Sequence, residues 1–228
     1  MENLLKVLFY KLRIYKYAKK YLLKPYIMLM TVMFKFSSKK AIKKLVKTMD
    51  KHNPRYWLEF GTLLGAVREK GFISHAADID IAMYIEDRNP DLDSILRSNG
   101  FKLKKRAKLL SGDLIEESYH YKTSQVDFFY AYRKDGQIKL FDYQTIDNLP
   151  PNECIKKYGG LRVYENIVPD SDRIQYNFLG LETWIPNNYH VHLQELYGSD
   201  YMIVNKNWTE DSSPARKETS QFAVVEYL

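Results

Sequence analysis

The sequence predicts an α+β protein, with a mixed β-sheet flanked by helices and a basic helical extension at the N-terminus. Three observations lead to this prediction: segments that alternate polar and apolar residues, short helical segments between them, and an uneven distribution of charge. The 228 residues are enough to bury a core without disulfides. The chain has one cysteine, Cys154, so no internal disulfide can form and a reducing compartment is expected. Aromatic residues make up 14% of the chain, which argues against intrinsic disorder.

The domain is expected to begin with a strand, a turn, a helix and a second strand. Residues 55–60 are typical of a short buried strand, and Gly61-Thr62 predicts a turn in which the threonine hydroxyl caps a helix. That helix is expected over 63–70, where the next glycine ends it. Residues 78–84 alternate polar and apolar side chains, as a strand with two different faces does.

Further elements follow from the same patterns. We expect a helix over 90–98, strands over 114–121, 125–132 and 138–143, a strand near 178–185, and a helix near 188–197. The turn Lys134-Asp135-Gly136 has the composition of a hairpin and joins two of these strands. These strands and helices therefore form one α+β domain.

Charge divides the chain near residue 52. Residues 1–52 contain fourteen lysine and arginine residues and two acidic ones, a net charge of +12, so the remaining 176 residues carry −5 of the total of +7. Apolar residues recur between the lysines at near-helical spacing, and an apolar run, 26–34, follows Pro25, at which we expect the helix to break. This pattern predicts an amphipathic helix that lies on an anionic membrane surface. A solvated helical pair that packs on the domain is the alternative.

Several other classes of protein are not expected. The apolar run has nine residues, whereas a membrane-spanning helix needs about 20. The charge pattern does not resemble that of a secretory signal peptide. We therefore expect a cytoplasmic protein, peripheral on the inner face of a bacterial membrane. No recognised nucleic-acid-binding motif accompanies the charge, so no nucleic-acid partner is expected. His190 and His192 would point to different faces of a helix and are interpreted as surface or core residues, not metal ligands.

Asp78 and Asp80 carry the clearest indication of chemistry. Side chains at i and i+2 of a strand point to the same face, so the two carboxylates are expected a few ångströms apart. Their repulsion would raise one pKa unless a cation lies between them, and such oxygen ligands suit Mg²⁺ or Mn²⁺. The Gly61-Thr62 turn before a helix offers backbone N–H groups to a phosphate. A bare Asp-x-Asp also occurs on solvated strand faces, but here it follows this turn closely.

These residues resemble the signature of the LicD/fukutin family. The resemblance lies in residues 57–83 (WLEFGTLLGAVREKGFISHAADIDIAM), 126–130 (VDFFY), 184–186 (WIP), 196–198 (LYG) and Trp208, and it covers roughly residues 54–210. It implies a nucleotidyltransferase-like mixed β-sheet and a catalytic domain over residues 53–228, preceded by the basic extension over 1–52. Members of the family transfer phosphocholine or a phosphopolyol, such as ribitol phosphate, from a CDP-activated donor to a glycan.

The resemblance also implies roles for individual residues. Asp78 and Asp80 would hold the metal, and Asp127 would be the third ligand or the base that activates the acceptor hydroxyl. Donor phosphate would contact Gly61, Thr62 and Arg68. Glu59 is a candidate buried acid that orients the site, and His75 is a candidate proton acceptor, although an ordinary loop histidine is the better interpretation.

One departure from the family leaves other functions open. LicD members usually carry Trp-Asp-Asp just before the Asp-x-Asp, whereas this chain has His75-Ala76-Ala77, as fukutin-like members tend to lack those acids. We expect transfer of a phosphopolyol or phosphocholine to a glycan or lipid-linked glycan, with release of CMP. A nucleotidyltransferase that uses an NTP is one alternative. A non-catalytic glycan- or membrane-binding module is another, although three converging acids without a metal would destabilise its fold.

Overall fold

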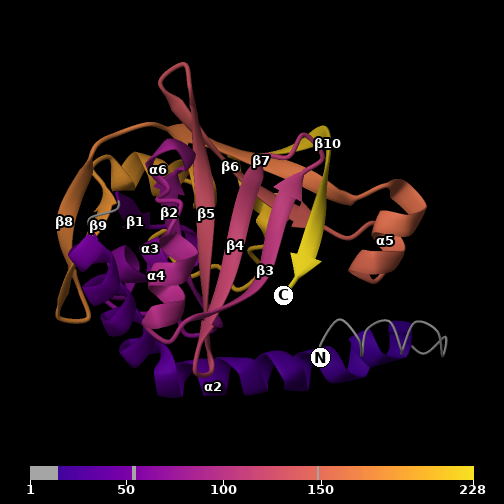
Figure 1. Ribbon diagram of the computed structural model, residues 1–228, viewed down its shortest axis with the longest axis horizontal. Helices are drawn as coiled ribbons and strands as arrows, with labels where there is room; N and C mark the ends of the chain where they lie inside the picture. Colours follow the sequence, from indigo (N-terminus) through magenta and orange to yellow (C-terminus); the bar gives the residue numbers. More distant parts are fainter. Residues whose placement is uncertain (1–14, 53–54, 148) are drawn as a thin grey trace.

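The computed structural model describes residues 15–52, 55–147 and 149–228 (Figure 1). The helices are α2 (Tyr15–His52), α3 (Phe60–Arg68), α4 (Leu92–Ser98), α5 (Pro151–Tyr158) and α6 (Tyr189–Tyr197). The strands are β1 (Tyr56–Leu58), β2 (Asp78–Tyr84), β3 (Lys102–Leu109), β4 (Leu114–Tyr121), β5 (Ser124–Lys134), β6 (Gln137–Gln144), β7 (Leu161–Pro169), β8 (Arg173–Phe178), β9 (Leu181–Pro186) and β10 (Arg216–Tyr227). The part of the predicted extension before residue 15 lies outside the described residues.

The main sheet closes on itself. Its strand order is β1-β2-β5-β4-β3-β10-β7-β6, and β6 also pairs with β5, so the strands from β5 to β6 form a six-stranded barrel. β1 and β2 extend from β5 outside this ring (Figure 1). β2 runs parallel to β5, whereas β4 and β6 run antiparallel to it. The predicted mixed sheet is confirmed, but its closure was not foreseen because pairing between distant strands leaves no local sequence pattern.

Helices cover one face of β2, and the opposite face carries two acidic residues followed by Ala82 and Tyr84, which are buried in a second hydrophobic cluster. Ile79 and Ile81 of β2 are fully buried in the main core, together with residues of α3 and α4. The second half of α2 joins this core through a helically spaced set of buried residues: Phe34, Ala41, Ile42, Leu45, Val46 and Met49. Asp78 and Asp80 alternate with the isoleucines and therefore point to the opposite face.

Helix α2 differs from the prediction at Pro25. The helix is continuous from Tyr15 to His52 with Pro25 inside it, so the predicted break is wrong. A proline removes one backbone donor, and the many other hydrogen bonds of a 38-residue helix, together with the packing of its second half, outweigh that loss. Within the described residues, no helix is both long enough and apolar enough to span a membrane.

The other predicted elements agree with the structure to differing degrees. The strand predicted over 114–121 coincides with β4, and the predicted hairpin turn joins β5 and β6 with Asp135 and Gly136 both at positive φ. The strand predicted near 178–185 corresponds to β9, but it begins at Leu181, because Leu179 and Gly180 form the turn between β8 and β9. The sequence patterns did not predict β3, α5, β7 and β10.

Candidate active site

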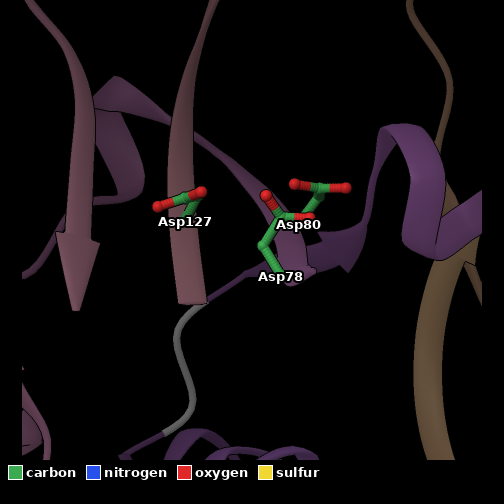
Figure 2. Close-up of side chains that lie close together, drawn as sticks. All are labelled: Asp78, Asp80 and Asp127. Atoms are coloured by element: carbon green, nitrogen blue, oxygen red, sulfur yellow. The ribbon is translucent and has the colours of Figure 1, made fainter. Parts of the chain in front are cut away.

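Asp78, Asp80 and Asp127 lie together at the junction of β2 and β5. The parallel register places Asp80 directly opposite Asp127, with Asp78 two residues earlier on β2. One carboxylate oxygen from each lies within 4.8 Å of the others. Figure 2 shows the three side chains on the same side of the two strands. Gln125 donates a hydrogen bond of 2.7 Å to Oδ2 of Asp127, whereas Oδ1 is buried and has no hydrogen-bond partner among the described residues.

Burial and mutual repulsion oppose ionisation of these three carboxyls. Burial raises the pKa of Asp80 well above its usual value, and the charges of Asp78 and Asp127 add to the rise. Burial raises the pKa of Asp127 to about 7, Glu116 contributes to this rise, and Lys105 acts in the opposite direction. The pKa of Asp78 is also raised, first by burial, and Lys105 again acts in the opposite direction.

The charges of the cluster are not balanced within the described residues. Glu116, on β4, shares this face of the sheet, and Lys105, on β3, is its ion-pair partner at 2.8 Å. Four carboxyl groups therefore face one lysine. A divalent cation would supply the missing positive charge, and the unpartnered Oδ1 of Asp127 is a free ligand atom of the kind that Mg²⁺ and Mn²⁺ prefer. The residues present thus fit the predicted metal.

Comparison with known proteins assigns the domain that carries this cluster. Residues 53–188 match the family model described as LicD/FKTN/FKRP, nucleotidyltransferase domain. The chain belongs to the LicD/FKTN/FKRP family. All three aspartates and the whole of α3 lie within the matched residues, so the resemblance of the Asp-x-Asp segment to this family is confirmed.

Individual relatives of the LicD/FKTN/FKRP family align with this chain over part of their length. The chain is 26% identical over 184 residues to mouse "Ribitol-5-phosphate transferase FKTN" and 24% identical over 184 residues to its human counterpart; each alignment covers 80% of this chain and 37% of the relative. It is 30% identical over 100 residues to mouse "Ribitol 5-phosphate transferase FKRP", covering 40% of this chain and 20% of that protein. The chain therefore spans little more than a third of the length of the first two.

Glu59, just before α3, and Thr62, in its first turn, fix the backbone of Asp80. The hydroxyl oxygen of Thr62 accepts a hydrogen bond of 2.9 Å from the backbone N–H of Asp80. The backbone carbonyl of Asp80 accepts a hydrogen bond of 3.1 Å from the backbone N–H of Glu59. Thr62 is buried and its hydroxyl positions Asp80, and its contact with a donor phosphate stays a prediction. The cap of α3 is Glu59, whose carboxylate accepts from the N–H of Phe60 at 3.0 Å, and the predicted threonine cap is wrong.

The predicted phosphate-binding turn offers one free amide. The N–H groups of Thr62 and Leu63 donate to the carbonyl of Glu59, and that of Phe60 donates to its side chain. Gly61 alone among these four consecutive residues, 60–63, has an N–H without a partner in the described chain. A Cβ atom at Gly61 would lie 3.4 Å from Oδ2 of Asp80, so glycine lets the backbone approach the carboxylate closely.

Arg68 and His75 occupy different environments from the aspartates. The guanidinium of Arg68 donates to the carbonyl of Tyr201 at 3.2 Å and to Glu69 at 2.9 Å, and its side chain is 10% exposed. Its Nε is buried and has no hydrogen-bond partner among the described residues, and its contact with donor phosphate stays a prediction. His75 is exposed in the loop before β2 and is not part of the cluster.

The sequence reasoning missed several residues around the cluster. Glu59 is fully buried, as predicted, but its partners were not foreseen: Nε1 of Trp57 donates to its Oε2 at 2.7 Å, and Nε2 of the core residue His192 lies 2.8 Å from its Oε1. Lys105, Glu116 and Tyr143 form a second missed group, in which Lys105 bonds Glu116 at 2.8 Å and the hydroxyl of Tyr143 at 3.0 Å. The polar alternation of 116, 118 and 120 was the available signal, but only the pairing of β4 with β5 gives it meaning.

Tyr197 and Trp208, two of the residues that carry the family resemblance near the C-terminal end, lie near the cluster. The rings of Tyr197 and Trp208 are 4.8 Å apart, and both line a small cavity of about 50 Å³ together with Phe60. Burial raises the pKa of Tyr197 well above its usual value, and the charge of Asp80 adds to this. An aromatic wall therefore adjoins the acidic cluster.

Proposed function

We propose that this chain is a metal-dependent phosphotransferase that moves a phospho-alcohol from a CDP-linked donor to a hydroxyl of a glycan and releases CMP. The observation that carries the proposal is the convergence of Asp78, Asp80 and Asp127, with excess negative charge, in a LicD/FKTN/FKRP domain. In this proposal residues 53–228 are the catalytic unit, the sheet around β2 and β5 is of nucleotidyltransferase type, and residues 1–52 are a basic helical extension of which the segment 34–49 packs on that unit.

The three aspartates would hold Mg²⁺ or Mn²⁺, which when bound neutralises negative charge on the donor phosphates. The chain contributes positioning, because Thr62 and Glu59 fix the backbone of Asp80. The acceptor oxygen would form a bond to the donor phosphorus as the bond to CMP breaks. The hydroxyl proton would pass to the carboxylate of Asp127 where that residue acts as the base; the alternative role of Asp127 is the third metal ligand.

The relatives support a particular donor. The mouse and human relatives are named ribitol-5-phosphate transferases, and each alignment covers 80% of this chain. We therefore place CDP-ribitol first among the donors, ahead of CDP-glycerol and CDP-choline. The acceptor would be a cell-surface glycan or a lipid-linked glycan, such as a capsule or a teichoic-acid-like polymer.

A release assay tests the reaction. Purified protein, Mg²⁺ and a glycan extract are incubated with each CDP-alcohol and with NTPs, and the nucleotides are separated by chromatography. We expect CMP from one CDP-alcohol, loss of CMP with Asp80→Asn, and full activity with Asp93→Asn, whose carboxylate pairs with Arg97 on the surface of α4. Release of pyrophosphate from an NTP would instead establish a nucleotidyltransferase. No turnover of any donor would favour a non-catalytic module.

The exposed face of α2 supports a peripheral position on an anionic membrane surface. Between residues 17 and 36 this helix exposes large apolar side chains: Tyr17, Tyr21, Met28, Leu29, Val32 and Phe36. Lys35, Lys39 and Lys40 are exposed next to them. Apolar side chains bordered by lysines are suited to insertion at the level of anionic headgroups. This position would keep the active site near membrane-linked acceptors.

Vesicle flotation tests the membrane surface. We expect the protein to float with vesicles that contain anionic lipid and to remain unbound with neutral vesicles. The double substitution Met28→Ser and Phe36→Ser should abolish flotation, whereas Val191→Ser, at an exposed apolar position of α6, should leave it unchanged. Equal flotation of the three proteins would refute this role of α2.

A further inference from the structure

A second cavity lies apart from the acidic cluster. Its volume is about 350 Å³, and none of the three aspartates lines it. The residues that define it are Trp57, Tyr84, Arg133, Arg173, Trp184 and His192. The imidazole of His192 contacts Glu59, and the backbone of Glu59 bonds Asp80, so these two residues separate the cavity from the metal ligands.

Arg173 is the residue of this cavity whose charge is least balanced. Among the described residues no carboxylate lies within 4.0 Å of its guanidinium, which donates to the carbonyl of Tyr56 at 3.2 Å. The side chain is half-buried, and its pKa is lowered, chiefly by burial. Asp172 also lines the cavity but is exposed. Asp87 and Asp50 act on this guanidinium from beyond 4.0 Å, so its positive charge is only partly balanced.

The other arginines of the cavity differ from Arg173. Arg133 pairs with Asp170 at 3.0 Å and with Glu86 at 3.1 Å, so most of its charge is balanced. Arg55 lies 3.5 Å from Asp87. A ligand with one anionic group would therefore find its strongest partner at Arg173, with the paired arginines adding to the positive potential.

Aromatic rings hold two of these guanidinium groups in place. The guanidinium of Arg173 lies 4.2 Å from the ring centre of Trp184, and that of Arg133 lies 3.5 Å from the ring centre of Tyr84. Stacking fixes the plane of a guanidinium and leaves its edge free to bind two oxygens of one anion. The volume of the cavity corresponds to the lower end of small-molecule sites, which begin at about 300 Å³.

We propose that this cavity binds the anionic group of a sugar phosphate or sugar acid, with two of its oxygens on the guanidinium edge of Arg173. Phosphate and carboxylate each offer two oxygens to one guanidinium, so the group recognised is an oxyanion carried by a molecule the size of a sugar. The assignment of this sugar to the acceptor chain rests on the proposed function. The binding itself does not, because it requires neither a CDP donor nor a metal.

Titration of the intact chain with defined probes tests the proposal. Trp57 and Trp184 line the cavity, so their fluorescence reports occupancy, and calorimetry gives the affinity. The probes are ribose 5-phosphate, glucuronate, inorganic phosphate and, as the neutral control, ribose. We expect saturable binding of one of the sugar anions and none of ribose. Saturation by inorganic phosphate with equal affinity would mean that only the oxyanion is recognised, and would overturn the sugar assignment.

Matched variants locate the binding. Arg173→Gln should weaken it by about tenfold or more, since a charge-assisted bidentate pair is lost. Arg97→Gln removes an equal charge from the surface of α4 and should bind like wild type. Asp80→Asn should also bind like wild type, which separates this site from the proposed catalysis. Equal affinities for Arg173→Gln and Arg97→Gln, or no binding by wild type at about 10 mM probe, would overturn the proposal.

Discussion

The two faces of strand β4 carry adjacent buried glutamates in opposite electrostatic situations. Glu117 is fully buried and is bonded by Arg88 at 3.0 Å, by Arg106 at 2.7 Å and by the hydroxyl of Tyr130 at 2.5 Å. Glu116, on the other face, shares Lys105 with Asp78 and Asp127 of the candidate site. One face holds more cations than acids, and the other holds four acids and one cation.

The titration behaviour of the two faces follows from this difference. Burial lowers the pKa of Arg88, but Tyr130 and Glu117 more than reverse this and raise it overall, so the arginine stays charged beside its glutamate. On the opposite face the pKa values of the acids rise, because burial and like charges act together. A buried acid with matched cations stabilises a fold, whereas an unmatched group of acids is arranged for a cation that comes from outside.

The largest expected effect is on activity. Replacing Asp127 by Asn keeps the shape of the side chain but removes a ligand charge and the proposed base. We expect CMP release to fall by about a thousandfold, which corresponds to about 4 kcal/mol of transition-state stabilisation. Glu116→Gln, on the same face but outside the metal ligands, should lower the rate much less. Comparable losses in the two variants would mean that total charge, and not ligation by Asp127, governs the rate.

The next largest effect is on stability and distinguishes the two glutamates. Glu117→Gln leaves Arg88 and Arg106 without their carboxylate, and we expect a loss of about 3 kcal/mol in the free energy of unfolding. Glu116→Gln removes an acid from the crowded face, so Lys105 can pair with Asp127 and the loss should be small. Urea unfolding of both variants at pH 7 gives the comparison. A larger loss for Glu116→Gln would reverse our interpretation of the two faces.

A smaller effect of opposite sign is expected at Asp80. In metal-free protein at pH 8, Asp80→Asn relieves repulsion by Asp78 and Asp127 and should raise the free energy of unfolding by about 1–2 kcal/mol. Excess Mn²⁺ should stabilise wild type and leave the variant unchanged. Thermal unfolding with and without Mn²⁺ measures both quantities. Destabilisation of the metal-free variant would argue against excess negative charge in the cluster.

The pH dependence gives the finest comparison. The folded pKa of Asp127 is about 7, above its ordinary value of 3.8, so this group contributes stability below pH 4 that is lost as pH rises through 7. The stability of metal-free wild type relative to Asp127→Asn should therefore decline between pH 5 and pH 8, whereas its Mn²⁺ affinity should increase over the same range. A stability difference that is constant with pH would contradict the raised pKa.

Local sequence patterns predicted the strand that carries Asp78 and Asp80 because two-residue alternation is a property of one segment. They placed Asp127 on a second strand, but the register that sets it opposite Asp80 depends on tertiary pairing. The balance of charge was not predictable for the same reason. Lys105 and Glu116 meet across the pairing of β3 with β4, and they reach the aspartates only because β4 also pairs with β5. Thr62 was assigned to the wrong partner because a hydroxyl at a helix start can serve a neighbouring strand as well as its own helix.

Calorimetric titration with Mn²⁺ at pH 7.5 tests the central claim most directly. We predict that wild type binds Mn²⁺ with measurable heat, that Asp78→Ala and Asp80→Ala abolish it, and that Asp142→Ala preserves it, since that carboxylate is already paired with Arg216 at 2.6 Å. Equal heats for wild type and Asp78→Ala, or no heat with wild type, would contradict the assignment of the cluster as a metal centre.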